Sequence, residues 1–189
     1  MKTCAFFGHR NVEASDNMIC LLRDILKDLI VNGTIEFIFG SKSQFDTICY
    51  QVVSELKEIY PHINRISFNA PHEEVFTSQK EKEYFENVTL KLFKRKECYK
   101  LFEKAFDSEN AVKAKRNAYI ARNKDMIDKS DVCLFYYDEN YQPPLRVKSK
   151  YLYEYQPKSG TGYAYQYAKQ KKKHIINIFP MLKKENKIT

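Results

Sequence analysis

Short apolar runs alternate with segments of helical spacing in the first part of the chain. The runs Lys2–Phe7, Thr34–Phe39 and Asn64–Asn69 have the length and composition of buried strands, and the first two are followed by a glycine. Between them, over residues 16–32 and 45–60, apolar side chains recur every three or four positions, as on one face of a helix. This β-α-β-α-β order predicts a doubly wound parallel sheet.

The pattern changes in the second part of the chain. Residues 71–113 are charged, aromatic and helix-forming, and we expect a helical insert packed on the sheet edge. A helix over 114–129 then leads to a strand at Asp131–Tyr137, and another strand is expected at His174–Phe179. Residues 138–158 contain two adjacent prolines and alternating tyrosines, which fit either a β-hairpin arm or an ordered loop.

These elements predict one α/β domain over residues 1–180. The fold expected is Rossmann-like and doubly wound, with a mainly parallel sheet of about five strands, and residues 181–189 follow as a loosely held basic tail. The chain has 189 residues, of which 43% are hydrophobic and 14% aromatic. That composition is sufficient for one well-packed domain and argues against disorder as the main state.

Cysteine usage and the N-terminus indicate a cytoplasmic protein. The five cysteines are widely spaced and include no C-x-x-C pair, so we expect reduced thiols that are mostly buried. The apolar stretch at the N-terminus is too short for a signal peptide. No run reaches the length needed to cross a membrane, and we expect no membrane partner.

The formal net charge of +8 favours an anionic ligand. Much of the excess comes from lysines in two tracts, Lys169–Lys173 and Lys183–Lys187. Lysines near a helix C-terminus also suit the helix dipole and solvation. The charge therefore does not choose between a small anion and a nucleic acid, and the sequence shows no nucleic-acid module.

Polar or glycine-containing clusters follow the predicted strands at three places. In an open parallel sheet, ligands bind outside the carboxyl ends of the strands. The combination of the three clusters predicts a phosphate-binding crevice. Its candidate residues are Gly8, His9 and Arg10; then Gly40, Ser41, Lys42, Ser43, Gln44, Phe45 and Asp46; and finally Ser159, Gly160, Thr161 and Gly162.

The side chains of these clusters suit an anion, although each has a structural alternative. Arg10 can form a forked contact with phosphate, and His9 can donate to it or stack beside it. Ser159 or Thr161 can cap a helix whose free amides point at the same anion. Surface turns and ordinary helix caps are the alternatives. In the helix over 114–129, Arg122 and Asn123 are further candidates, and a salt-bridged helix surface is the alternative for this pair.

The sequence lacks the motifs of several common cofactor, metal and nucleophile sites. The Walker A loop and the G-x-G-x-x-G dinucleotide fingerprint are absent. The histidines and cysteines show no zinc-ligand spacing, and no G-x-S-x-G nucleophile motif is present. We therefore expect no metal site and no required cofactor.

The ordered set of motifs resembles the SLOG superfamily and, within it, the YpsA-like branch. The resemblance spans Cys4 to Ile178, and it rests on Phe7-Gly8-His9-Arg10, Phe39 to Asp46, Arg122 to Asp128, and Ser159-Gly160-Thr161 followed by Ala164 and Tyr167-Ala168. It implies a Rossmann-like sheet that binds nucleotides or nucleotide-derived molecules, including ADP-ribose-type signals.

The resemblance extends more distantly to cytokinin-activating phosphoribohydrolases, which cleave an N-glycosidic bond. Those enzymes carry a P-G-G-x-G-T-x-x-E loop and a helix with an R-K-x-x-M-like element. Arg122-Asn123-Lys124-Asp125-Met126 loosely matches the second element, and Gly160-Thr161 matches part of the first. The glutamate of the loop is replaced by Ala164, which can neither stabilise an oxocarbenium ion nor activate water. This departure argues against a hydrolase.

Three functions follow in order of preference. The first is binding of a nucleotide or ADP-ribose-like small molecule by a sensor, sequestering agent or regulator. The second is a nucleotide N-glycosidase that takes its acid from Asp46, Asp125 or Glu154, and the third is nucleic-acid binding through the lysine tracts. A homodimer with residues 71–113 at its interface also remains open.

Overall fold

The structure is a computed structural model. It describes residues 1–40, 43–71, 73–94, 99–114, 117–143, 145–148, 153–155 and 159–185. Ser41 and Lys42, both expected in the crevice, lie outside the described residues, as does Cys98.

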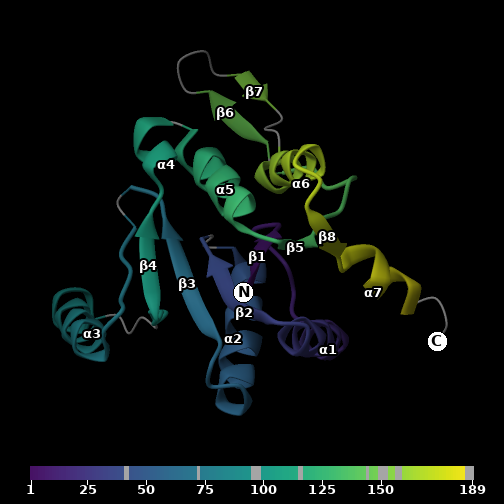
Figure 1. Ribbon diagram of the computed structural model, residues 1–189. Coiled ribbons are helices and arrows are strands. Elements are labelled where there is room, and N and C mark those ends of the chain that lie inside the picture. Colours follow the sequence, from purple (N-terminus) through teal and green to yellow (C-terminus); the bar gives the residue numbers. More distant parts are fainter. Residues whose placement is uncertain are drawn as a thin grey trace.

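A parallel sheet of six strands forms the centre of the fold (Figure 1). The strand order is β4-β3-β2-β1-β5-β8, and every neighbouring pair is parallel. The chain therefore moves outward from β1 to one edge and then returns to β5 on the other side of β1, which confirms the doubly wound arrangement. The strands are β1 (Lys2–Gly8), β2 (Thr34–Phe39), β3 (Asn64–Asn69), β4 (Lys104–Asp107), β5 (Val132–Tyr136) and β8 (His174–Asn177).

Helices cover both faces of the sheet (Figure 1). The pair α1 and α2 lies on one face, and the pair α5 and α6 lies on the other. Each helix of a pair also packs against its neighbour. The helices are α1 (Asp16–Val31), α2 (Gln44–Ile59), α3 (Gln79–Phe93), α4 (Glu109–Ala114), α5 (Ala118–Lys129), α6 (Gly160–Gln170) and α7 (Phe179–Glu185).

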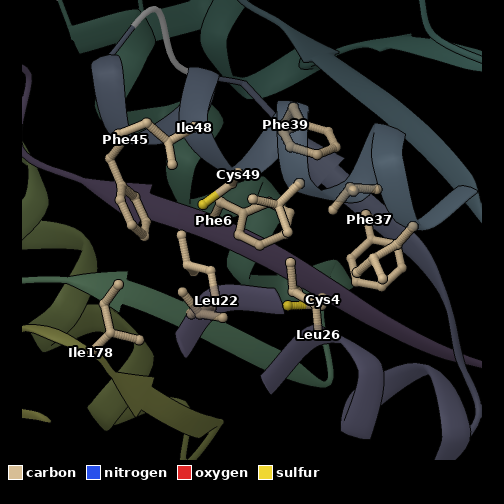
Figure 2. Close-up of a cluster of buried hydrophobic side chains, with 14 of the residues drawn as sticks. Cys4, Phe6, Leu22, Leu26, Phe37, Phe39, Phe45, Ile48, Cys49 and Ile178 are labelled. Carbon is tan, nitrogen blue, oxygen red and sulfur yellow. The ribbon is translucent and has the colours of Figure 1, made fainter. Parts of the chain in front are cut away.

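Strand alternation divides the core between these two faces. Cys4 and Phe6 of β1 point toward α1 and α2, where the Phe6 ring lies 4.9 Å from that of Phe39 (Figure 2). Ala5 and Phe7 point toward α5 and α6. Because both faces of β1 are fully covered, its sequence is apolar throughout, as expected for a central parallel strand.

The segment expected as a helical insert contains a strand as well as helices. Within residues 71–113, α3 and most of α4 are helical, but β4 extends the sheet beyond β3. Arg65 of β3 holds the start of this strand, because its guanidinium forms a 2.6 Å ion pair with Glu103. A strand of only four residues with mostly exposed side chains has no apolar pattern to reveal it.

Two C-terminal expectations are refined. The arm over 138–158 contains an antiparallel pair, β6 (Arg146–Lys148) and β7 (Tyr153–Tyr155), which agrees with the hairpin alternative. The expected loose tail instead begins inside α7, and Leu182 of this helix packs against the α1 and α2 side of the core. This apolar contact of Leu182, within a lysine-rich segment, holds α7 against the core.

The described cysteines are unpaired thiols. Cys4, Cys49 and Cys133 are buried, whereas Cys20 is exposed. Burial raises the pKa of Cys4 and Cys49 well above the ordinary value, and it raises the pKa of Cys133 to about 12. Such thiols are protonated and act as small apolar core residues. None of the described helices combines the length and the apolar character that crossing a membrane requires.

Candidate functional site

The three predicted clusters adjoin at the carboxyl end of β1. Thr161 Oγ1, at the start of α6, donates a 2.9 Å hydrogen bond to the carbonyl oxygen of Gly8. On the other side, the amide of Gln44 at the start of α2 donates to the carbonyl oxygen of Arg10 at 2.9 Å. The side-chain oxygen of Gln44 accepts from the amide of Val12 at 2.8 Å. These contacts fix the loop after β1 between the amino ends of two helices.

A pocket of about 240 Å³ opens at this point, and we name it the His9 pocket. It lies where the strand order reverses between β1 and β5, the position at which doubly wound proteins bind their ligands. Arg10 is exposed at the pocket, so its guanidinium is accessible to an anion. The lining residues are His9, Arg10, Asn11, Tyr141, Pro143, Leu145, Ser159 and Thr161.

His9 is buried in this pocket with one ring nitrogen unpaired. Its side chain stacks on Tyr141, with ring centres 3.9 Å apart, and the residue is only 3% exposed. Nε2 accepts a 3.0 Å hydrogen bond from the amide of Asp138. In the neutral ring the proton must therefore sit on Nδ1, which is buried and has no partner among the described residues.

The charge state of His9 follows from this burial. Desolvation lowers the pKa of His9 from the ordinary value of 6.5, and the nearby carboxylate of Asp138 only partly opposes the shift. The ring is therefore neutral at neutral pH. It offers a single N–H donor and no charge, so any positive charge in the pocket comes from Arg10 and the helix terminus.

The amino end of α6 supplies further donors. Ser159 caps the helix, since its hydroxyl accepts from the amide of Gly162 at 3.2 Å and its carbonyl accepts from the amide of Tyr163 at 3.1 Å. The amides of Gly160 and Thr161 make no hydrogen bond among the described residues. A side chain added at Gly160 would meet open space, so a ligand can approach the backbone there.

A second pocket, of about 300 Å³, lies beside the ends of β2 and β3, and we name it the Glu73 pocket. Of the three carboxylates among its described lining residues, two have separate cationic partners. Asp46 is buried and pairs with Lys100, whose Nζ lies 2.7 Å from Oδ2. Glu73 is paired with Arg122. The lining residues are Phe39, Gly40, Asp46, Thr47, Ser67, Glu73, Glu74, Val75, Tyr99, Lys100 and Phe102.

Arg122 is a buried ion-pair residue. It is 2% exposed, and one terminal nitrogen donates to both carboxylate oxygens of Glu73 at 3.2 Å. The other terminal nitrogen donates to Asn123, whereas Nε is buried without a partner among the described residues. Burial lowers the pKa of Arg122, and the Glu73 carboxylate opposes that shift. The contacts of Arg122 therefore match the salt-bridge alternative more closely than a direct contact with a ligand.

Two of the predicted glycines are required by packing. A Cβ atom on Gly8 would lie 2.3 Å from the Phe45 ring, which is fully buried beneath it. A Cβ atom on Gly40 would lie 2.5 Å from the sulfur of Met126 and 3.0 Å from Nε of Arg122. Both glycines thus allow side chains from neighbouring helices to cover the strand ends, irrespective of any ligand.

Some of the predicted residues line one of three pockets, and the others hold the surrounding helices and strands in place. His9, Arg10, Ser159 and Thr161 share the His9 pocket, and Gly40 and Asp46 line the Glu73 pocket. Asn123 and Gly160 line a third pocket, between α5 and α6. The others hold the scaffold: Ser43 caps α2, Gln44 and Phe45 support β1, Gly162 completes the α6 cap, and Arg122 pairs with Glu73.

Sequence reasoning did not find Glu73, Lys100 or Tyr141. Glu73 follows the end of β3, so the rule that located the other clusters could have located it too. The same rule applies to Tyr141, which follows the end of β5. Lys100 carries no such signal, because it reaches Asp46 from a distant part of the sequence. No group of His, Cys, Asp and Glu residues suited to a metal ion occurs within the described part of the chain.

The lysines after α6 make structural contacts. Nζ of Lys173 donates to the backbone carbonyl groups of Asp128 and Ser130 at the end of α5. Lys171 forms a 2.8 Å ion pair with the Asp128 carboxylate. These amino groups satisfy and neutralise the negative end of a neighbouring helix.

A family model and a solved structure are similar to this chain. No curated protein matches the sequence. A solved structure of DNA processing protein A from Helicobacter pylori, described for its single-stranded DNA binding mode, is similar at 14% identity and a TM-score of 0.45. That match covers 92% of this chain and 63% of the other. The sequence model of YpsA, the YspA SLOG family, matches residues 6–174, and the chain therefore belongs to this family.

Proposed function

We propose that the protein binds a nucleotide or a nucleotide-derived, ADP-ribose-like small molecule in the His9 pocket. Through that binding it would act as a sensor, a sequestering agent or a regulator. The observation that carries the proposal is the convergence of donors at the switch point of the sheet. The unpaired Nδ1 of buried His9, the exposed Arg10 and the free amide of Thr161 belong to residues that line this pocket, and the free amide of Gly160 precedes that of Thr161 at the start of α6.

Each donor suits a different part of such a ligand. Arg10 and the α6 amides supply charge and directed N–H groups for a phosphate. The Tyr141 ring, held against His9, offers an aromatic surface for a base. At about 240 Å³ the pocket is smaller than most ligand clefts, which span roughly 300–1,000 Å³. It would therefore enclose the phosphorylated end of the ligand and leave the rest near the surface.

Calorimetric titration with a panel of ligands tests this proposal. The panel is AMP, ATP, NAD, ADP-ribose, cyclic ADP-ribose and, as an uncharged control, adenosine. We expect a phosphorylated member to bind and the variant Arg10→Gln to weaken it by about tenfold to a hundredfold, since the arginine hydrogen bond to phosphate is charge-assisted. Arg23→Gln, on α1 and paired with Glu55, is the matched control and should leave affinity unchanged.

Failure of every phosphorylated ligand to bind would count against the proposal. So would equal losses in the Arg10 and Arg23 variants, because a general loss of positive charge would then explain both. Mass spectrometry of small molecules released from the purified protein provides an independent search for the ligand.

A second candidate, a nucleotide N-glycosidase, is favoured by the Glu73 pocket. Ala164 occupies the position of the hydrolase glutamate and is buried in the core. Asp46 and Glu73 nevertheless bring two carboxylates to one pocket, with Arg122 bound to the second. Asp125, by contrast, is held by Ser108 and Asn110 away from this pocket, and the Glu154 side chain lies outside the described residues.

Release of free base from nucleoside monophosphates tests the enzyme hypothesis. Activity should disappear in Glu73→Gln and in Arg122→Ala if this pocket catalyses the reaction. A thermal melt of each variant is needed, because both changes disturb a buried ion pair. Base release that survives in folded Glu73→Gln would exclude Glu73 as the catalytic carboxylate.

A further inference from the structure

The α5 side of the sheet is open near the β4 edge. α5 and α6 pack over the central strands, but α4, which directly follows β4, has only six residues. A groove of about 760 Å³ lies over β2, β3 and β4, and we name it the α5–β4 groove. Its floor is apolar and consists of Ile38, Ile66, Phe68 and Phe106.

Carboxylates line this groove on a chain whose net charge is +8. Lys129 supplies the one cationic side chain among the described residues that line the groove. Its Nζ lies 5.8 Å from the centre of the Phe68 ring. The acidic lining residues are Glu36, Asp107, Glu109, Asp125 and Asp128. The groove therefore has the opposite electrostatic preference to the His9 pocket, and it would repel an anionic ligand.

Three of these carboxylates are not neutralised. Lys104 pairs with Glu36 at 3.0 Å, and Lys171 pairs with Asp128 at 2.8 Å. Asp107, Glu109 and Asp125 form no ion pair within the part of the chain that the structure describes. Neutral partners hold two of the three, since Asp107 accepts from Asn69 and Asp125 from Ser108 and Asn110. Their negative charge is thus available to a cationic partner.

The outer edge of β4 is unpaired among the described strands. Arg65 and Asn69 of β3 accept from the amides of Glu103 and Ser108, so their backbone groups face β4. In this parallel register Ala105 lies opposite Ser67 and Asp107 lies opposite Asn69, so the backbone groups of Ala105 and Asp107 point away from the sheet. The Phe106 side chain is 48% exposed at the same edge. An exposed strand edge beside an apolar floor is the arrangement that accepts an added strand.

We propose that the β4 edge and the α5–β4 groove together dock a basic, extended segment of a partner polypeptide. Such a segment pairs with the backbone of Ala105 and Asp107, and alternate apolar side chains cover the Phe106 ring. Its Lys or Arg side chains reach Asp107 and Glu109 across the groove. Charge selects this occupant, because a second copy of a chain with net charge +8 brings repulsion and a nucleic acid is repelled by the carboxylates.

Fluorescence anisotropy with two synthetic peptides tests the docking site. One peptide alternates Arg with Val and Phe, and its match carries Glu in place of Arg. We expect binding of the Arg peptide alone, weakened about tenfold by the double variant Asp107→Asn/Glu109→Gln, as the loss of two partly screened pairs predicts. The control variant Asp24→Asn/Asp28→Asn lies on α1, on the other face of the sheet, and should bind normally.

Hydrogen exchange distinguishes an added strand from simple charge attraction. The outward-facing amides of Ala105 and Asp107 should exchange quickly in the free protein and become protected when the Arg peptide binds. Three results would overturn the proposal: no binding, equal binding by the groove and control variants, or binding without protection of these amides. Amides already protected in a self-associated protein would assign the edge to a second copy instead.

Discussion

The hydroxyl of Thr161 is hydrogen-bonded to the carbonyl oxygen of Gly8 across 153 positions of sequence, at 2.9 Å. This contact joins the end of β1 to the amino end of α6, where Ser159 and Thr161 line the His9 pocket. It also determines what the threonine can do, because the hydroxyl proton is already used. Thr161 can accept from a ligand, and its backbone amide can donate to one.

Replacing Thr161 by Val should therefore open the pocket and reduce stability. The change removes the donor and leaves the Gly8 carbonyl without this partner, at a cost of about 1–3 kcal/mol in the free energy of unfolding. Urea denaturation measures that loss. Thr161→Ser keeps the hydroxyl and is the control, so equal destabilisation by Val and Ser would show that the hydrogen bond is not the cause.

A methyl group should have opposite effects at two glycines of the site. Gly8→Ala places a Cβ atom 2.3 Å from the buried Phe45 ring, and overpacking of this kind costs about 1–3 kcal/mol of stability. Gly160→Ala meets open space in the first turn of α6, where alanine should preserve or slightly raise stability. Thermal melts compare the two variants, and a destabilised Gly160→Ala protein would contradict the open surface described for that position.

The same pair of variants bears on ligand binding. If the Gly160 amide contacts phosphate, the added methyl group crowds the ligand, and Gly160→Ala should lose affinity while it keeps its stability. Full affinity for a bound nucleotide would place that ligand away from the α6 terminus.

The apolar pattern was sufficient to predict most of the sheet. Thr34–Phe39 and Asn64–Asn69 were predicted with the bounds that the structure gives them, because buried parallel strands carry continuous apolar runs. β4 was missed for the opposite reason. Its side chains Lys104, Phe106 and Asp107 are exposed, and the strand exists because β3 and the Arg65–Glu103 pair hold it.

The candidate site was predictable in position but less so in its contacts. Strand ends and glycines located the loops correctly, since the topology of a doubly wound sheet brings such loops to one edge. Tertiary partners could not be predicted in the same way. Arg122 meets Glu73 from 49 positions away, and His9 meets the amide of Asp138 from 129 positions away. Because of these contacts, Arg122 is part of a buried ion pair and His9 is a neutral hydrogen-bond donor.

Breaking the Arg122–Glu73 pair from one side should be strongly destabilising. Glu73→Ala leaves the buried guanidinium without its carboxylate, and such losses cost about 3–5 kcal/mol. The double variant Glu73→Leu/Arg122→Met removes both charges and should be closer to the wild type than Glu73→Ala is. Urea unfolding of the three proteins measures this. A double variant less stable than Glu73→Ala would show that Arg122 contributes through contacts other than the ion pair.

The burial of His9 predicts a loss of stability in mild acid. Its pKa in the folded protein lies below the ordinary 6.5 of the unfolded chain, so the contribution of His9 is complete above about pH 6.5. As the pH falls through 6.5, the unfolded state binds a proton that the folded state does not, and stability declines by at most about 1.4 kcal/mol per pH unit. Carboxylates with lowered pKa values, such as that of Glu103, contribute only at more acidic pH.

Unfolding free energies at pH 8, 7, 6 and 5.5 should therefore separate wild type from His9→Gln. The glutamine offers an amide oxygen to the Asp138 N–H but does not titrate, so its curve should be flatter over this range. Subtracting the two curves cancels the contribution of the other histidines.

A phosphorylated ligand should change the pH dependence of stability, because an anion near Nδ1 favours the charged His9 ring. Ligand-bound wild type should then lose less stability in mild acid than the free protein does, whereas parallel curves for free and bound protein would place the phosphate away from His9.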